Sequence, residues 1–412
     1  MNHDAQQILD ATLREALPGA AVCQALDQIA FHPGGRLILV AAGKAAWEMA
    51  RAAHERLGER VSAGVVVTKY DHSKGEIPRC TVYEGGHPVP DENSFRGTRA
   101  AMDLVQNLTA EDTVVFLVSG GGSALFESPL VPGGDLARLT KDLLACGADI
   151  VEMNTLRKRL SAVKGGKFVQ LCAPAQVYAI VLSDILGDPL DMIASGPAYP
   201  DSSTREDAWA AVEKYNLSLT DEMKALLDVE TPKQLDNVET VITGSVRELC
   251  AAAAQACRQL GYEPTVLTDR LCCQAKEAGS FLASIAKSHE DSDHALAFLA
   301  GGETVVQLTG SGLGGRNQEL ALAAAEGISG LADTLVFSLG SDGTDGPTDA
   351  AGGLVDGTTK ARLEEAGRSI HQVLQENDAY HALQLVDGLI CTGPTGTNVN
   401  DVAVVLIRRA EK

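Results

Sequence analysis

The sequence lacks any apolar run of membrane-spanning length, which would need about 20 consecutive residues. It also lacks the basic segment and apolar core of a secretory signal peptide, since it begins MNHDAQQILDATLREALPGA. We therefore expect neither a membrane-spanning nor a secreted protein.

Positive charge is scarce as well, with 34 Lys and Arg against 55 Asp and Glu and a formal net charge of -21. Nucleic acids and anionic membrane surfaces bind basic faces, so we expect neither as a partner. Any anionic ligand must be held by local positive groups that act against the overall field.

Paired cysteine motifs are missing too. The nine cysteines are scattered and include no C-x-x-C, and the adjacent Cys272 and Cys273 suit neither an ordinary disulfide nor a zinc site. We therefore predict that the protein resides in the reducing cytoplasm.

What is present is an alternation of apolar strands and helical stretches. Buried strands are indicated at 36–42, 113–120 and 177–184, and the alternation begins again at 240–246 after a charged connector. Alternating strands and helices indicate parallel sheets covered on both faces. We predict an α/β protein of two three-layer α/β/α domains, residues 1–237 and 238–412, with mainly parallel, Rossmann-like sheets.

A glycine-rich segment follows the strand at 113–120, and in such sheets ligands bind beyond the carboxyl ends of the strands. This segment runs Ser119, Gly120, Gly121, Gly122, Ser123, and its backbone amides suggest a nest for the phosphates of a nucleotide. Lys44, after the strand at 36–42, supplies a point charge for the same purpose. A plain turn and a solvated lysine are the other interpretations. The hydrolase pattern G-x-S-x-G is not found around either serine.

A second glycine-rich segment lies within GGETVVQLTGSGLGGRNQEL, residues 301–320. Arg316 stands here at the start of a helix, after Gly310, Gly312, Gly314 and Gly315. Glycines let a ligand approach the backbone, a helix N-terminus attracts anions, and arginine binds phosphate or carboxylate with two donors. We interpret this segment as an anion cradle, with a tight turn as the alternative.

Acidic and amide side chains at other strand ends offer further chemistry. Asp184 and Asp188 in SDILGDPLDMIASGP are candidates to hold Mg²⁺ through water or to orient a hydroxyl nucleophile, although helix capping would also explain carboxylates here. Asp342 and Asp345 in SLGSDGTDGPTDAAGG are candidate metal ligands whose spacing does not fit an EF-hand. Asn398 is a candidate substrate ligand.

One dinucleotide-binding template fits in part. Gly310, Gly312 and Gly315 satisfy G-x-G-x-x-G between a strand and a helix. Asp342 lies further along than the usual interval of about 20 residues, and Arg316 is an unusual residue after the third glycine. The P-loop pattern is absent, because Gly43 and Lys44 are followed by alanine.

Taken in order along the chain, these motifs resemble the class II glycerate 2-kinases, whose C-terminal part is the MOFRL domain. The resemblance rests on AAGKAAWEMA, VTKYDHS, EGGHPVPDENS, FLVSGGGSALFESP, MNTLRKRLSAVKGG, VLSDILGDPLDMIASGP, GGETVVQLTGSGLGGRNQELAL, SLGSDGTDGPTDAAGG and TGPTGTNVNDV.

The resemblance implies transfer of the ATP γ-phosphoryl group to the 2-hydroxyl of D-glycerate, with Mg²⁺, in a cleft between the two domains. It implies Lys44 and Arg316 as catalytic and substrate-binding residues and maps the S-D-I-L-G-D aspartates to Asp184 and Asp188. Phosphoryl transfer depends on positioning and charge neutralisation, which these residue types can supply.

Two other functions stay open at this stage. Some relatives carry a hydroxypyruvate reductase label, which suggests an NAD(P)H-dependent reductase, and a non-catalytic metabolite-binding protein is a third hypothesis. The presence of both cations and carboxylates at strand ends favours an enzyme. The sequence does not determine the oligomeric state, and a homodimer is one assembly that it allows.

Overall fold

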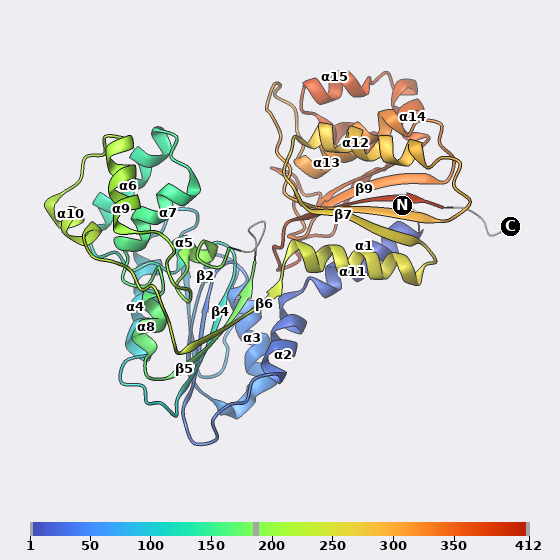
Figure 1. The fold of residues 1–412 in the computed structure, drawn as a ribbon. Coiled ribbons are helices and arrows are strands. Elements are labelled where there is room, and N and C mark those ends of the chain that lie inside the picture. The colour runs from blue at the N-terminus through green and yellow to red at the C-terminus, as the bar shows by residue number, and fades with distance from the viewer. Residues whose placement is uncertain (1–2, 184–188, 409–412) are drawn as a thin grey trace. The chain divides into compact units, whose positions relative to one another are not determined.

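The computed structural model describes residues 3–183 and 189–408, which form two compact units. One unit comprises residues 18–243 and is called here the N-terminal unit; the other joins residues 1–17 to residues 244–412 and is called the C-terminal unit. Figure 1 shows a sheet with helices on both faces in each unit. The predicted α/β class is confirmed.

The N-terminal unit is built on a six-stranded sheet in the order β3-β2-β1-β4-β5-β6. The pairings from β3 through β5 are parallel, as predicted. The central strands are buried along their whole length, as expected for strands covered on both faces. The strands are β1 Leu37–Ala42, β2 Val61–Lys69, β3 Cys80–Gly85, β4 Thr113–Val118, β5 Gln176–Leu182 and β6 Val238–Gly244.

Helices α2 and α3 cover one face of this sheet, and α4 and α8 cover the other (Figure 1). On the α4 face, Phe116, Phe126 and Phe168 pack together with ring centroids 4.7 to 5.4 Å apart. The elements are α2 Pro18–Asp27, α3 Ala46–Leu57, the short helix η1 Gly58–Arg60, α4 Glu92–Leu104, α5 Gly122–Leu125 and α8 Lys167–Cys172.

A helical cluster inserted between β4 and β6 has a small apolar core of its own. Leu139, Leu143, Leu156 and Met223 are among its buried side chains. The cluster consists of α6 Gly133–Ala145, α7 Ile150–Arg159, α9 Arg205–Lys214 and α10 Asp221–Leu227, with the short helix η2 Ile193–Ser195 between α7 and α9.

The C-terminal unit holds a second six-stranded sheet in the order β11-β10-β9-β12-β8-β7. Only its β7–β8 pairing is parallel, and the remaining four pairings are antiparallel among the strands described. The strands are β7 Glu263–Leu271, β8 Leu296–Gly302, β9 Thr334–Gly340, β10 Gly352–Asp356, β11 Leu389–Ile390 and β12 Asp401–Ile407.

This mixed sheet corrects the expectation of a mainly parallel one in the second half of the chain. A parallel neighbour requires a crossover connection, usually a helix, whereas antiparallel strands can be joined by a short loop. A loop without a helix joins β9 to β10, and another delivers β12 to the edge where β8 and β9 end, with Asp401 opposite both Gly302 and Gly340. Strands β10 and β12 therefore run antiparallel to their neighbours.

Helices α1 and α11 lie on one face of this sheet, and α12 and α13 lie on the other (Figure 1). Three shorter helices pack beside α13. The helices are α1 His3–Glu15, α11 Val246–Gln259, α12 Ala275–Ser288, α13 Arg316–Gly327, α14 Thr359–Glu365, α15 Ile370–Gln375 and α16 Ala379–Leu385. Within the described residues, no helix combines the length and the apolarity needed to cross a membrane.

The first helix belongs to the compact unit formed by the second half of the chain. Ala5, Ile8 and Leu9 of α1 are buried, and Tyr262 donates a hydrogen bond of 2.7 Å from its hydroxyl to Asp4. Arg408 pairs with the same carboxylate. At the other boundary, β6 joins the N-terminal sheet. The predicted division at residue 237 placed α1 in the N-terminal domain and β6 in the C-terminal domain, whereas the structure places α1 in the C-terminal unit and β6 in the N-terminal sheet.

Candidate active site

The carboxyl edge of the N-terminal sheet brings Lys44 and the segment Ser119–Ser123 together. The Lys44 amide donates to the Gly120 carbonyl at 2.8 Å, and the Ala45 amide donates to Ser119 Oγ at 3.1 Å. Gly43 has a φ of 126°, and a Cβ there would lie 2.2 Å from Ser119 Oγ. Only glycine allows the two loops to approach this closely. The two segments thus form one rim, as the strand-end rule predicts.

Several backbone amides of this rim are open. Within the described part of the chain, the amides of Gly120, Gly121 and Ser123 have no hydrogen-bond partner, whereas the Gly122 amide donates to the Ser119 carbonyl at 3.3 Å. Successive free amides in a turn form a concave site for an anion. The geometry therefore supports the predicted phosphate nest, with Lys44 beside it.

A network of small polar side chains supports this nest from the next loop. Ser123 Oγ lies 3.0 Å from Ser195 Oγ, and Ser195 Oγ donates to Asn154 Oδ1 at 2.9 Å. Ala194 and Ser195 have φ values of 52° and 61°, which are uncommon for residues with a side chain and are often found at functional sites. Sequence reasoning missed this network because it singled out only the aspartates of the motif that ends in IASGP.

Asp191 in that motif has a structural role. Its carboxylate accepts a hydrogen bond of 2.6 Å from Ser202 Oγ and pairs with Lys158 Nζ at 3.4 Å. Lys158 is buried and also pairs with the buried Asp201 at 3.0 Å. Asp184 and Asp188, the predicted catalytic aspartates, lie outside the described residues.

Arg316 of the C-terminal unit is fixed by two carboxylates. Its Nε and Nη2 donate to the two oxygens of Asp401 at 2.5 and 3.0 Å, and its Nη1 lies 3.0 Å from Glu303. Burial raises the pKa of Asp401 above its ordinary value, and the contact with Arg316 opposes this increase. Asp401 therefore positions the guanidinium of Arg316.

The glycine-rich segment before Arg316 is closed against the loop that joins α15 to α16. The Thr309 and Gly310 amides donate to Asn377 Oδ1 at 2.7 and 2.9 Å, and the Gly312 amide donates to the Glu376 carbonyl at 2.7 Å. A Cβ at Gly310 or Gly312 would lie within 2.5 Å of Glu376 backbone atoms. These glycines are required for close packing, so the interpretation of an open anion cradle is corrected for this part of the segment.

The N-terminus of α13 already holds a carboxylate of the protein. Asp345 accepts from the amides of Asn317 and Gln318 at 3.2 and 2.9 Å, and a Cβ on Gly315 would lie 2.2 Å from its Cγ. Burial raises the pKa of Asp345 to about 6, against the effect of these amides. A dinucleotide pyrophosphate would need the same amides, so this helix does not offer the Rossmann phosphate site. Gly314 keeps an amide without a partner among the described residues.

The remaining predicted site residues of the C-terminal unit are Asp342 and Asn398. Asp342 Oδ1 accepts from the amide and hydroxyl of Thr344 at 2.9 and 3.1 Å. Within the described residues, no group of three or more His, Cys, Asp and Glu side chains is arranged to hold a metal ion. Asp342 and Asp345 therefore form no metal-binding cluster by themselves. The half-buried Asn398 makes no side-chain hydrogen bond within the same residues.

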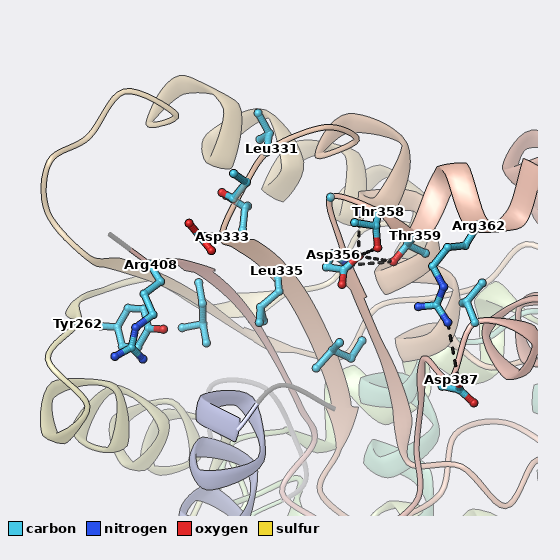
Figure 2. A pocket seen from close by; sticks show the side chains of 16 residues that line it. Tyr262, Leu331, Asp333, Leu335, Asp356, Thr358, Thr359, Arg362, Asp387 and Arg408 are labelled. Carbon is cyan, nitrogen blue, oxygen red and sulfur yellow. Dashed lines mark hydrogen bonds and ion pairs between the residues drawn. The ribbon is translucent and has the colours of Figure 1, made fainter. Parts of the chain in front are cut away.

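A cavity of about 550 Å³ lies at the opposite edge of the C-terminal sheet (Figure 2). Leu406 at the end of β12 and Leu335 at the start of β9 line it, whereas Asp401 and Gly340 occupy the other ends of these strands. Figure 2 shows Asp356 bonded to Thr358 and Thr359, and Arg362 paired with Asp387. This cavity contains none of the predicted site residues.

An α/β chain that offers free backbone amides beside a lysine in one unit, and a fixed arginine in the other, has the features of an enzyme acting on phosphorylated or carboxylated small molecules. Two family models match the chain: a domain of unknown function, DUF4147, over residues 4–228, and the MOFRL family over residues 296–401.

Relatives of known name match almost the whole chain. A D-glycerate 2-kinase of Thermotoga maritima is 50% identical, covering 97% of this chain and 97% of its own. A glycerate 2-kinase of Pyrococcus horikoshii is 41% identical, covering 92% and 88%. The crystal structure of a glycerate kinase from T. maritima superposes with a TM-score of 0.95 at 49% identity, covering 98% and 99%. The chain belongs to the glycerate 2-kinase family, as its motifs indicated.

A relative of lower identity carries a different name. A protein of Agrobacterium vitis that carries a provisional hydroxypyruvate reductase name is 38% identical, covering 98% of this chain and 93% of its own. It is less similar to this chain than both kinases.

Proposed function

We propose that this protein transfers the γ-phosphoryl group of ATP to the 2-hydroxyl of D-glycerate and forms 2-phospho-D-glycerate. The observation that carries the proposal is the near full-length match, at 50% identity, to a protein named D-glycerate 2-kinase. The open amides of Gly120, Gly121 and Ser123 beside Lys44 support it, since a kinase must hold phosphate oxygens.

In the N-terminal unit we assign phosphate binding to the segment Ser119–Ser123 and charge stabilisation to Lys44. A lysine acts on phosphate as a point charge, and fixed amides stabilise charge as it develops on the transferring group. The network of Ser195 and Asn154 keeps Ser123 in place. Lys44 is half-buried and forms no ion pair with any described residue, so its charge is available to a ligand.

In the C-terminal unit we assign Arg316 to the substrate anion or to the transferring phosphoryl group, and Asn398 to a substrate hydroxyl. Glu303 and Asp401 orient the guanidinium before substrate binds, which lowers the cost of ordering it. The Gly314 amide, which has no partner among the described residues, is assigned to the same anion. Asp184 and Asp188 stay predictions for the base or for a metal contact.

Magnesium enters in this proposal with the nucleotide, as MgATP. Such an ion keeps several waters and needs only one or two protein carboxylates in addition to phosphate oxygens. Asp342 fits that requirement because only its Oδ1 accepts protein hydrogen bonds within the described residues. Asp345 fits less well, because its two oxygens accept amides of α13.

The reductase alternative is disfavoured by the glycine-rich segment at 310–315. Its amides are bonded to the 376–378 loop, and the amides at the start of α13 are bonded to Asp345. A nicotinamide dinucleotide would have to displace these contacts to place its pyrophosphate there.

Product identification tests the proposal. After incubation with D-glycerate and MgATP, phosphorus NMR should show a 2-phosphoglycerate resonance and ADP. A 3-phosphoglycerate product would contradict the regiochemistry, and ATP left unchanged would contradict the kinase function. Oxidation of NADH with hydroxypyruvate, followed by absorbance in the same preparation, would favour the reductase instead.

We also propose that the reaction takes place in the cytoplasm. All nine cysteines are free, which suits a reducing compartment. The predicted homodimer and the predicted cleft between the domains stay predictions.

A further inference from the structure

Four basic side chains surround the carboxyl ends of β1, β2 and β3, beside the glycines that follow β4. Lys44 follows β1, Lys69 is the last residue of β2, His72 lies in the next turn, and His87 follows β3. The strands end level with one another, since Lys69 pairs with Gly85 and Ala42 pairs with both Val67 and Val118. The loops that follow four neighbouring strands, β3, β2, β1 and β4, therefore lie together at the carboxyl edge of the sheet.

Gly121 lies between two of these basic side chains. Its φ is 83°, and a Cβ there would lie 3.0 Å from Lys44 Cγ, 3.0 Å from His87 Cδ2 and 3.1 Å from His87 Nε2. Lys44 and His87 thus flank the same glycine. His72 Nδ1 lies 3.0 Å from the Lys44 carbonyl oxygen, so this ring nitrogen carries the proton and the ring holds the Lys44 backbone.

Among the residues that the structure describes, the basic side chains at this edge have no ion-pair partner. No ion pair forms at Lys44 or Lys69 within the described residues, and His87 makes no hydrogen bond there. Burial and the charges of Lys44, Lys69 and His72 lower the pKa of His87 to about 4. Like charges gathered with no carboxylate partner are unfavourable unless an anion joins them. By contrast, Arg316 has two carboxylates.

We propose that Lys44, Lys69 and His87, with the free amides of Gly120 and Gly121, form an oxyanion subsite of the N-terminal unit. Neutral His87 donates a hydrogen bond from Nε2, the two lysines supply charge, and His72 positions Lys44. The ligand is a phosphate or a carboxylate group of a substrate. This inference extends the phosphate site of the proposed function and rests on it for the identity of the substrate.

Binding measured without turnover tests the subsite. Histidine side chains of the full chain are observed by NMR during titration with inorganic phosphate and, separately, with D-glycerate. We expect the His87 resonances to shift with saturation, and the pKa of His87 to rise on binding because the anion stabilises its charged form. A shift with phosphate alone assigns the subsite to the nucleotide, and a shift with D-glycerate alone assigns it to the carboxylate.

Substitutions identify the contributing groups. Lys69→Met and His87→Gln should each raise the Kd of the effective anion about tenfold, the usual loss for one hydrogen bond to a charged group. Lys74→Met is the matched control, because Lys74 is exposed and its nearest carboxylate is Glu48 at 3.9 Å; its Kd should not change. The same variants should raise the KM of one substrate and leave the KM of the other near its original value.

Two results would overturn the inference: His87 resonances that respond to neither anion, or Kd values in Lys69→Met and His87→Gln equal to those of Lys74→Met. Failure of the proposed kinase function would be recognised separately. In that case no 2-phosphoglycerate would form, while phosphate would still bind in a manner that depends on Lys69 and His87.

Discussion

The two cationic residues predicted from sequence differ in how the protein holds them. Lys44 is fixed through its backbone and its side chain lacks a carboxylate partner within the described residues, whereas Arg316 is bound by Asp401 and Glu303. A lysine available in this way can follow a moving phosphoryl group, and a guanidinium held by two carboxylates offers a fixed direction.

We expect Arg316→Ala to lower turnover by about 10²–10³, the usual effect of removing one charge-stabilising donor. The variant should also lose stability, on the order of 1–3 kcal/mol, because the nearly buried Asp401 loses its partner. Steady-state kinetics and urea unfolding measure the two effects.

The double variant Arg316→Ala with Asp401→Asn separates the effect on turnover from the effect on stability. Removing the unpaired carboxylate should restore most of the stability and none of the turnover. Near-normal turnover in either variant would remove Arg316 from the mechanism.

At the scale of elements, the two glycine-rich segments differ in whether their backbone amides are free or hydrogen-bonded. The segment after β4 keeps free amides, while the segment before α13 has its amides bonded to the loop at 376–378. A side chain at Gly121 would crowd Lys44 and His87, whereas a side chain at Gly310 would collide with the protein backbone at Glu376. Composition alone does not distinguish these uses.

Asn377→Gly should release the second segment without straining the backbone. Asn377 has a φ of 54°, which glycine adopts readily, so the substitution removes only the side chain. We expect faster hydrogen exchange at the Thr309 and Gly310 amides and a stability loss of about 1–3 kcal/mol. Unchanged exchange at both amides would contradict the assigned role.

The start of α4 gives a prediction about pH. Asp91 caps this helix and accepts from the Ser94 amide at 2.9 Å. Burial raises the pKa of Asp91, but bonds from Tyr70, Ser94 and Gly86 outweigh it and lower the pKa to about 2. Because this lies below the unfolded value of about 3.9, the stabilisation is present above about pH 4 and is lost as the pH falls toward 2.

Asp91→Asn keeps a residue that can cap the helix but removes the charge that these hydrogen bonds stabilise, so it should cost about 1 kcal/mol at about pH 6 and less at about pH 3. Urea unfolding of wild type and variant at both pH values measures the difference. A difference that stays constant between the two would show that the Asp91 charge does not contribute.

At the scale of the whole molecule, the first helix stabilises a unit that is far from it in sequence. The buried face of α1 packs on α11, and Asp4 accepts from Tyr262. Each buried aliphatic side chain contributes about 1.5–3 kcal/mol.

Deletion of residues 1–17 should accordingly weaken the C-terminal unit and leave the N-terminal unit unchanged. Hydrogen exchange resolved by peptide should show faster exchange in β7, β8 and α11, with β1 and β4 as the internal control. As a point variant, Leu9→Ala should reproduce part of the effect, and the exposed Gln7→Ala should not. Equal acceleration in both units would contradict the assignment of α1.

The sequence by itself determined the α/β class, the kinase family and the rim that joins Lys44 to Ser119–Ser123. These are local properties. Apolar runs of strand length, glycines at strand ends and the order of motifs can be recognised before any long-range contact is known.

Only the tertiary structure decided which strands run antiparallel, which glycine-rich segment is open and which basic residues join Lys44. Lys69, His72 and His87 are ordinary residues in the sequence, and they gather because parallel strands end at the same edge of the sheet. The amides of Gly310 and Gly312 are occupied because Asn377 and Glu376 fold back onto them from far along the chain. Such contacts depend on the packing of distant segments, which local patterns do not encode.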